Sequence, residues 1–233
     1  MKDKLKKTIQ TTLNKIFQHF PVKKAVYIES FGGQYNDNPK YISEALHTLH
    51  QEVTIYWLIG DKCGSEERKA LPSYIKTVTP KNLKYYWIRN CAKVTVDNYY
   101  GVYISEIFDK SLLALKNNKQ FGISTWHGTP MKLISRVKEK NTVFASTDLM
   151  ISGSEYATKW LNKSLFDRLA FPDFLPFWEC GYPRNDILVT GADRKKFKHK
   201  LGFNDDDRIV LIAPTFRPNN VKESGVRITE ELD

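Results

Sequence analysis

Short apolar runs alternate with helix-like segments along most of this chain, and this alternation constrains the fold more than any other feature. Apolar, β-branched and aromatic residues predict strands at 25–30, 53–59, 75–78, 93–97 and 148–152. Helix patterns stand between or after them, at about 38–50, 83–91 and 154–169. Strands that alternate with helices in this way form βαβ units, so the sequence predicts an α/β fold with a mostly parallel sheet.

The first 24 residues carry most of the excess positive charge. They hold seven lysines and a single acid, Asp3, which gives +6 of the chain's net charge of +10. Apolar residues from Leu5 to Phe20 follow helical spacing, so residues 2–20 are expected to form an amphipathic helix that Pro21 ends. Such a helix either lies on an anionic membrane surface or packs its apolar stripe on the following domain.

Composition excludes several other classes. No run of about 18 apolar residues is present and the N-terminus has no apolar signal region, so we expect a cytoplasmic protein without a membrane span. The cysteines, Cys63, Cys91 and Cys180, lie far apart without nearby histidine pairs. They predict buried thiols, with neither a disulfide framework nor a zinc site. No nucleic-acid recognition motif accompanies the basic charge, so we expect no nucleic-acid partner.

The segment Thr125-Trp-His-Gly-Thr-Pro130 is predicted to join a strand to a helix. Gly128 can take a positive φ, Thr129 suits an N-cap and Pro130 suits the first helical turn. His127 would then lie at the carboxyl end of a strand, where α/β proteins bind ligands, with Lys132 one turn into the helix. From this pattern alone, a packed Trp-His pair is as good an interpretation as a catalytic histidine.

Two other turns contain candidate residues. In residues 31–38 a glycine-rich loop precedes Asn38-Pro39, which predicts an N-cap and a first-turn proline, and Gly33 fits a tight turn better than a phosphate loop. Residues 171–190 are interrupted by prolines and predict a connector. Arg184 in this connector either clamps a phosphate or pairs with Asp186.

The last part of the chain predicts the start of another domain. A short basic helix is expected at 193–201, and Arg208 to Ala213 reads as a buried strand that leads to Arg217. Only about 16 residues follow, too few for a domain of ordinary size. We therefore expect a second domain that is incomplete within this chain.

Four segments together resemble the CDP-glycerol glycerophosphotransferase family, which primes or polymerises teichoic acids. They are Glu29–Lys40, Thr125–Lys132, Gly181–Asp186 and Ala213–Arg217, and the second is the most specific. The resemblance implies a GT-B-like fold with two Rossmann-like domains. It divides the chain into a membrane-associating helix (1–24), an acceptor and catalytic domain (25–180), and a linker with the start of a nucleotide-binding domain (181–233).

The resemblance also implies a reaction and a site. A hydroxyl of a lipid-linked teichoic acid acceptor would attack the β-phosphate of CDP-glycerol and release CMP, with His127 as the catalytic base. No metal or other cofactor is expected. The protein would act at the cytoplasmic face of the membrane, as a peripheral protein on an anionic surface. Residues that would bind phosphate or acceptor are Gly33, Asn38, Gly128, Thr129, Lys132, Arg184 and Arg217.

The family's second functional histidine and its serine-rich CDP-binding motif have no counterpart in this sequence. The alternative is therefore a truncated, non-catalytic remnant that binds membrane or acceptor but not CDP-glycerol.

Overall fold

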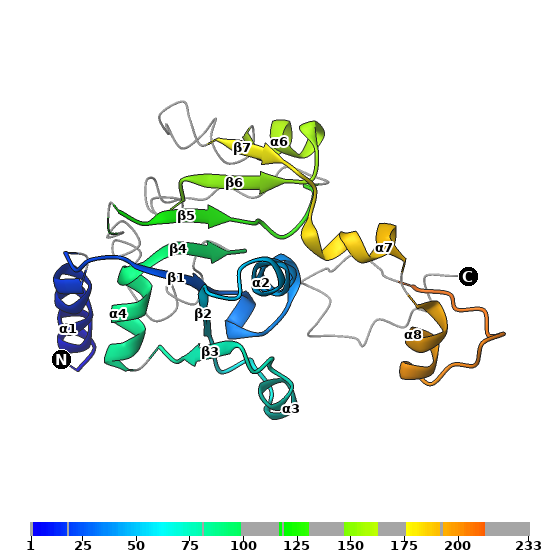
Figure 1. Ribbon diagram of the computed structural model, residues 1–233, viewed down its shortest axis with the longest axis horizontal. Helices are drawn as coiled ribbons and strands as arrows, with labels where there is room; N and C mark the ends of the chain where they lie inside the picture. The colour runs from blue at the N-terminus through cyan, green and yellow to red at the C-terminus, as the bar shows by residue number, and fades with distance from the viewer. Residues whose placement is uncertain are drawn as a thin grey trace, which may run out of the picture. The chain divides into compact units, whose positions relative to one another are not determined.

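The computed structural model describes residues 2–17, 19–80, 82–98, 117, 119–130, 147–162, 176–191 and 193–212. The chain comprises two compact units, Met1–Thr190 and Gly191–Asp233. The first unit contains the sheet (Figure 1).

Within the described ranges, seven parallel strands form the sheet, in the order β3-β2-β1-β4-β5-β6-β7 (Figure 1). Their bounds are β1 Lys23–Ile28, β2 Thr54–Leu58, β3 Ile75–Val78, β4 Ala92–Asp97, β5 Phe121–Ser124, β6 Leu149–Ser152 and β7 Phe177–Glu179. Every pairing is parallel, which confirms the α/β class with a parallel sheet that the alternating pattern predicts. The strands expected at 25–30, 53–59, 75–78, 93–97 and 148–152 are all present, each within about two residues of its expected ends.

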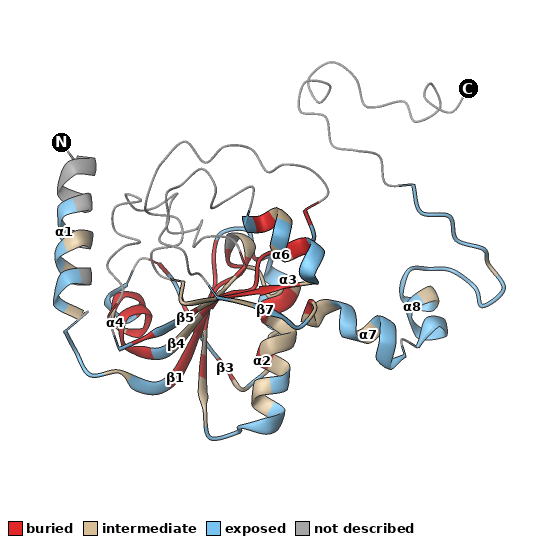
Figure 2. Cartoon of the chain, turned by 90° about the horizontal axis from the view of Figure 1, so that it is seen from above, coloured by how far each residue is buried: buried red, intermediate tan, exposed pale blue. Residues whose placement is uncertain are grey.

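Helices cover both faces of this sheet, so the central strands are buried on both sides. Among the described residues of the first unit, the α-helices are α1 Lys2–Phe17, α2 Asp37–Leu49, α3 Ser65–Lys69, α4 Leu83–Cys91, α6 Glu155–Leu161 and α7 Asp186–Thr190. On β1, Ala25 and Tyr27 join the core with α4, whereas Val26 and Ile28 join the core that α2 covers. Figure 2 shows the strands as the buried centre of this unit.

The strand order contains one change of direction. From β1 the chain passes to β2 and β3 on one side, and then returns to β4 on the other side of β1 and continues outward to β7. The connections that leave β1 and β4 therefore diverge, and they open a space at the carboxyl ends of these two strands. Ligands of open parallel sheets bind at such a switch point.

Helix α1 packs part of its apolar stripe on the domain. Leu13 and Phe17 contact the core beside α4, whereas Ile9 and Ile16 are about half exposed. The helix ends at Phe17, three residues before the expected end. Within the described ranges, no helix has the length and apolar character needed to cross a membrane.

Several local expectations from the sequence are wrong. Helix α2 begins at Asp37 with Asn36 as its N-cap, so Asn38 lies inside the first turn rather than capping it. The segment expected to be a connector contains both β7 and α7, because Phe177–Glu179 pairs with the outer side of β6. Cys63 and Cys91 are buried as expected, but Cys180, which follows β7, is exposed.

The second unit contains α8, Arg194–Lys200, with Asp193 as its N-cap. The helix expected at 193–201 is therefore confirmed. The strand expected from Arg208 to Ala213 is not formed over residues 208–212, where Val210 and Leu211 are more than 80% exposed. An extended segment becomes a strand only with a hydrogen-bonded neighbour, and no described segment pairs with this one.

Candidate functional site

The candidate residues meet at the carboxyl edge of the sheet, over the switch point between β1 and β4. The loop after β1 leads through the short 3₁₀ helix η1, Phe31–Gly33, into the first turn of α2. Asn98 follows β4, the turn with His127 follows β5, and a second 3₁₀ helix, η4 (Pro183–Asn185), follows β7. Residues far apart in sequence are thus neighbours because their strands end at the same edge.

The turn after β5 has an unusual backbone that orients His127. Trp126 has a φ of +50° although it is not glycine, and its side chain is 2% exposed. The His127 ring stacks on the Trp126 ring with 4.1 Å between centroids, and it lies 5.6 Å from the Phe31 ring. The sequence suggested Gly128 as the residue with positive φ in this turn, but the residue that adopts it is Trp126. Such a conformation is maintained only where the surroundings hold it.

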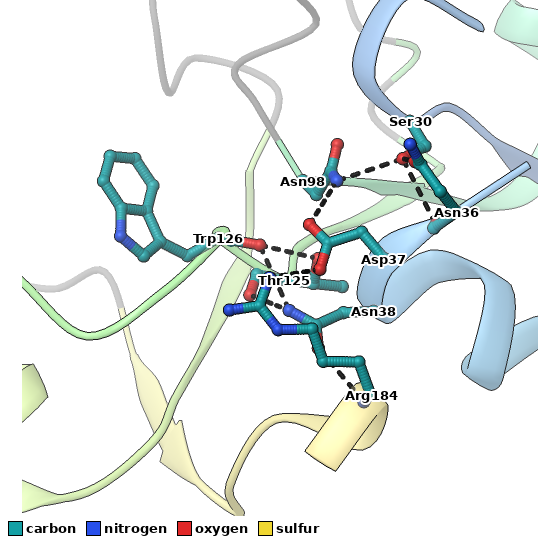
Figure 3. Close-up of polar contacts among 8 residues, drawn as sticks. All are labelled: Ser30, Asn36, Asp37, Asn38, Asn98, Thr125, Trp126 and Arg184. Carbon is teal, nitrogen blue, oxygen red and sulfur yellow. Dashed lines mark hydrogen bonds and ion pairs between the residues drawn. The ribbon is translucent and has the colours of Figure 1, made fainter. Parts of the chain in front are cut away.

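Asn38 is the side chain that holds this turn. Its Nδ2 donates to the carbonyl oxygens of Thr125 at 3.4 Å and Trp126 at 3.3 Å, and its Oδ1 accepts from the backbone N–H of Arg184 at 3.3 Å. The side chain is fully buried. Figure 3 shows that the Trp126 carbonyl faces Asn38, whereas the Trp126 indole points away from these contacts. One amide thus ties the first turn of α2 to the loops after β5 and β7.

A second set of polar contacts lies beside it (Figure 3). Asp37 forms an ion pair with Arg184 through Oδ1, and its Oδ2 accepts from Asn98 Nδ2 at 2.7 Å. Asn98 Nδ2 also lies 3.0 Å from Ser30 Oγ, so the ends of β1 and β4 are linked. The expectation that Arg184 pairs with Asp186 is wrong, because Asp37 reaches it from the opposite side of the sheet's switch point.

The guanidinium of Arg184 also approaches the His127 turn. A Cβ placed on Gly128 would lie 3.5 Å from Arg184 Nη2, at ordinary contact distance, so this nitrogen lies next to the Gly128 backbone. The Arg184 side chain is 33% exposed, whereas that of Asp37 is 8% exposed. The cation is therefore anchored on its inner side and accessible on its outer side.

His127 is half-buried, and its surroundings favour the neutral ring. Burial lowers the pKa of His127 below its ordinary value, because the charged imidazolium loses solvation. The negative charge of Asp37 acts in the opposite direction and raises this pKa, and the positive charge of Arg184 lowers it. A neutral imidazole at neutral pH has an unprotonated ring nitrogen, which is what a general base requires.

Two glycines shape the walls of the site. Gly33 has a φ of +73°, and a Cβ there would lie 1.9 Å from the nitrogen of Gly60, so only glycine fits between η1 and the end of β2. Gly153, after β6, is covered by Tyr182, whose Cε2 would be 2.6 Å from an added Cβ. The same Cβ would lie 3.3 Å from the hydroxyl oxygen of Thr129. The role of Gly33 seen here is close backbone packing.

The structure brings five of the predicted site residues together: His127, Gly128, Thr129, Asn38 and Arg184. Lys132 and Arg217 lie outside the described residues. The helix expected to begin at Pro130 is not formed at Pro130 itself, and its remaining residues lie outside the described ranges. The sequence reading missed Asp37 and Asn98. Asn98 could have been found from its position directly after a strand, but no local pattern distinguishes Asp37 from the other turn residues around it.

Together these groups offer a proton acceptor and an anion-binding cation. His127 can take a proton from a hydroxyl, and the outer edge of Arg184 can donate to phosphate oxygens. Among the residues that the structure places, no group of three or more His, Cys, Asp or Glu side chains is arranged to hold a metal ion.

Known proteins with similar sequences are enzymes of teichoic acid synthesis. The chain is 29% identical to the teichoic acid poly(glycerol phosphate) polymerase of Bacillus subtilis, over 100% of this chain and 31% of that protein. It is 26% identical to the polymerase of the same name from Staphylococcus epidermidis, over 89% of this chain and 29% of that protein. The teichoic acid glycerol-phosphate transferase of Staphylococcus aureus is 28% identical, over 97% of this chain and 59% of that protein. The chain thus spans less than two thirds of the length of each of these relatives.

Solved structures agree with this relationship. The wall teichoic acid polymerase TagF, in one of its variants, superposes with a TM-score of 0.68 at 25% identity, over 90% of this chain and 53% of that one. Another TagF variant, soaked with CDPG, shares the fold with the same TM-score at 24% identity. The expected GT-B-like α/β class is confirmed by this likeness. The family model for CDP-Glycerol:Poly(glycerophosphate) glycerophosphotransferase matches residues 12–233, so the chain belongs to this family.

Proposed function

We propose that this chain transfers glycerol phosphate from CDP-glycerol to a hydroxyl of a teichoic acid acceptor, with His127 as the general base. The observation that carries the proposal is the half-buried His127, kept neutral by burial and placed beside the guanidinium of Arg184. Family membership supplies the substrate class, because the related proteins are named as glycerol-phosphate polymerases and transferases.

In the proposed reaction, His127 takes the proton of the acceptor hydroxyl. The acceptor oxygen then forms a bond to the β-phosphorus of CDP-glycerol, and the bond from that phosphorus to the bridging oxygen breaks, so that CMP leaves. Charge on the transferring phosphoryl group needs positioned donors. Arg184 would supply such donors from its exposed edge, and Gly128 and Thr129 would supply backbone and hydroxyl groups beside it. Lys132 and Arg217 remain proposed members of the same set.

The contacts of Asn38 support a positioning role rather than direct contact with a ligand. Both ends of its amide are used, and no part of the side chain is exposed. Gly33 likewise contributes close packing against β2. Both residues therefore belong to the framework of the proposed site, and they support the loops that contain His127 and Arg184.

Residues 1–24 are proposed to hold the protein on the cytoplasmic face of an anionic, acceptor-bearing membrane, as a peripheral protein. The lysine content supports this, and so do the exposed Ile9 and Ile16, because Leu13 and Phe17 already use the other part of the stripe for packing. Replacing Ile9 and Ile16 by glutamine should weaken sedimentation with anionic vesicles without unfolding the domain. The matched control is Leu49→Gln, since Leu49 is 74% exposed on α2. Equal sedimentation of all three proteins would contradict the proposal.

A binding role without transfer is the alternative, because the chain spans only part of the length of every relative compared above. The two functions differ in one assay. The full chain is incubated with radiolabelled CDP-glycerol and a lipid-linked glycerol phosphate acceptor, and released CMP and labelled acceptor are both measured. Equal amounts of the two products are expected from a transferase. Acceptor binding without either product would overturn transfer and support the alternative.

A further inference from the structure

We propose that Asp37 is a positioning residue of this site: its carboxylate anchors the Arg184 guanidinium beside Gly128 and balances the positive charge that this guanidinium brings to His127. The inference builds on the proposed function, in which His127 is the base. Neither the sequence pattern nor the family resemblance assigns a role to Asp37.

The first support is the way Asp37 is held. It is the first residue of α2 and has a φ of +57°, which is uncommon for a residue with a side chain. Such a conformation is strained, and it persists where other contacts outweigh the strain. Here it points the carboxylate toward the switch point, away from the capping position that Asn36 fills.

The second support is that each carboxylate oxygen has its own partner from a different strand end. Oδ1 pairs with Arg184 after β7, and Oδ2 accepts from Asn98 after β4 (Figure 3). Asn98 is 1% exposed and is fixed in turn by Ser30. The carboxylate therefore sits in a rigid frame, and the guanidinium that it holds cannot turn away from the His127 loop without breaking the ion pair.

The third support is the geometry of the guanidinium. Nη1 faces Asp37, whereas Nη2 lies next to Gly128, the residue after His127. A guanidinium has five N–H donors in a fixed plane, so the pair with Asp37 sets the direction of the remaining donors. Asp37 thus determines where the exposed edge of Arg184 points.

The fourth support is electrostatic. Among the described residues, the charged groups that act on the pKa of His127 are Asp37 from α2, which raises it, and Arg184 from η4, which lowers it. Burial lowers it as well and is the largest influence. Without Asp37, burial and Arg184 would act in the same direction, and His127 would become a weaker base. A loss of fold stability alone would not shift the pKa of His127 within the folded protein.

The test is an NMR titration of the full chain labelled on histidine, in which the His127→Gln variant identifies the His127 signals. Asp37→Asn is the main variant, because asparagine tolerates a positive φ and can still accept from Asn98. The midpoint of His127 should move to lower pH by about half a unit or more in Asp37→Asn. It should move to higher pH in Arg184→Met and return toward the parent value in the double variant. Glu66→Gln, an exposed carboxylate on α3, is the control and should leave it unchanged.

An unchanged or raised midpoint in folded Asp37→Asn would overturn the inference. If Asp37→Asn does not fold, Arg184→Met provides the test. A His127 midpoint that fails to rise in Arg184→Met would also overturn the inference, because Asp37 would then have no positive charge to balance. The titration uses no CDP-glycerol, so its result is independent of the transfer assay. Midpoints that shift as expected in a chain without transfer activity would leave the role of Asp37 standing and reject the proposed function alone.

Discussion

Replacing Asn38 by alanine should destabilise the protein and disturb the site at the same time. The change removes hydrogen bonds to the Thr125 and Trp126 carbonyls and from the Arg184 N–H, all between 3.3 and 3.4 Å. Each such bond contributes about 0.5 to 1.5 kcal/mol, and these long ones belong at the lower end of that range. The polar groups left buried without partners add about 1 kcal/mol or more. The expected loss in the free energy of unfolding is therefore about 2–3 kcal/mol.

Urea unfolding followed by tryptophan fluorescence measures this loss, and the melting temperature should fall by about 4–10 °C. Asn90→Ala is the matched control. Asn90 is equally buried, at the other end of the sheet, where its Nδ2 donates to the Tyr86 carbonyl at 2.8 Å. Both variants should lose stability, but only Asn38→Ala should shift the NMR signals of His127. A loss of less than about 0.5 kcal/mol in Asn38→Ala, or equal signal shifts in both variants, would refute the reasoning.

Three further predictions concern the backbone and the charge of the site. Gly33→Ala should lower the free energy of unfolding by about 3 kcal/mol or more, because the added Cβ would collide with the backbone of Gly60. Gly181→Ala, also at positive φ but in open space, should lower it by only about 1 kcal/mol. Equal urea midpoints of the two variants would contradict this. Gly153→Ala should push Tyr182 aside and lower proposed transfer as well as stability, so full activity in that variant would contradict the packing argument. Because the pKa of His127 is lowered on folding, unfolded chains bind its proton more readily, and stability should fall as the pH drops through about 6.5 toward the lowered value. The difference in free energy of unfolding between the parent and His127→Gln should therefore shrink as the pH falls over this range. A difference that does not change with pH would contradict the prediction.

The sequence predicts the layered fold well because hydrophobic periodicity reports burial directly. The strands at 53–59 and 75–78 and the helix at 83–91 could all be found in this way, since each fills the core on one or both faces. Strand β7 is hard to predict because it is three residues long, mostly exposed and flanked by prolines. The strand expected at 208–213 shows the opposite error, because apolar content does not supply a hydrogen-bonded neighbour.

The site was predictable only in part, for a similar reason. The Trp-His-Gly turn contains a reactive side chain next to a strand end, which is a local signal. The contacts that hold it are not local, since Asp37 and Asn38 precede His127 by about 90 residues and Arg184 follows it by more than 50. The left-handed conformation of Trp126 depends on those contacts, so the sequence assigned it to Gly128, the residue that adopts it at no cost.

The transfer rate of the full chain and its His127→Ala variant, measured side by side with labelled CDP-glycerol and a lipid-linked acceptor, tests the central claim most directly. General-base catalysis contributes about 10²–10⁴-fold, so the variant should lose at least about 100-fold while its circular dichroism spectrum stays that of the parent. A folded variant that keeps its rate within about tenfold of the parent would contradict the role of His127 as the base.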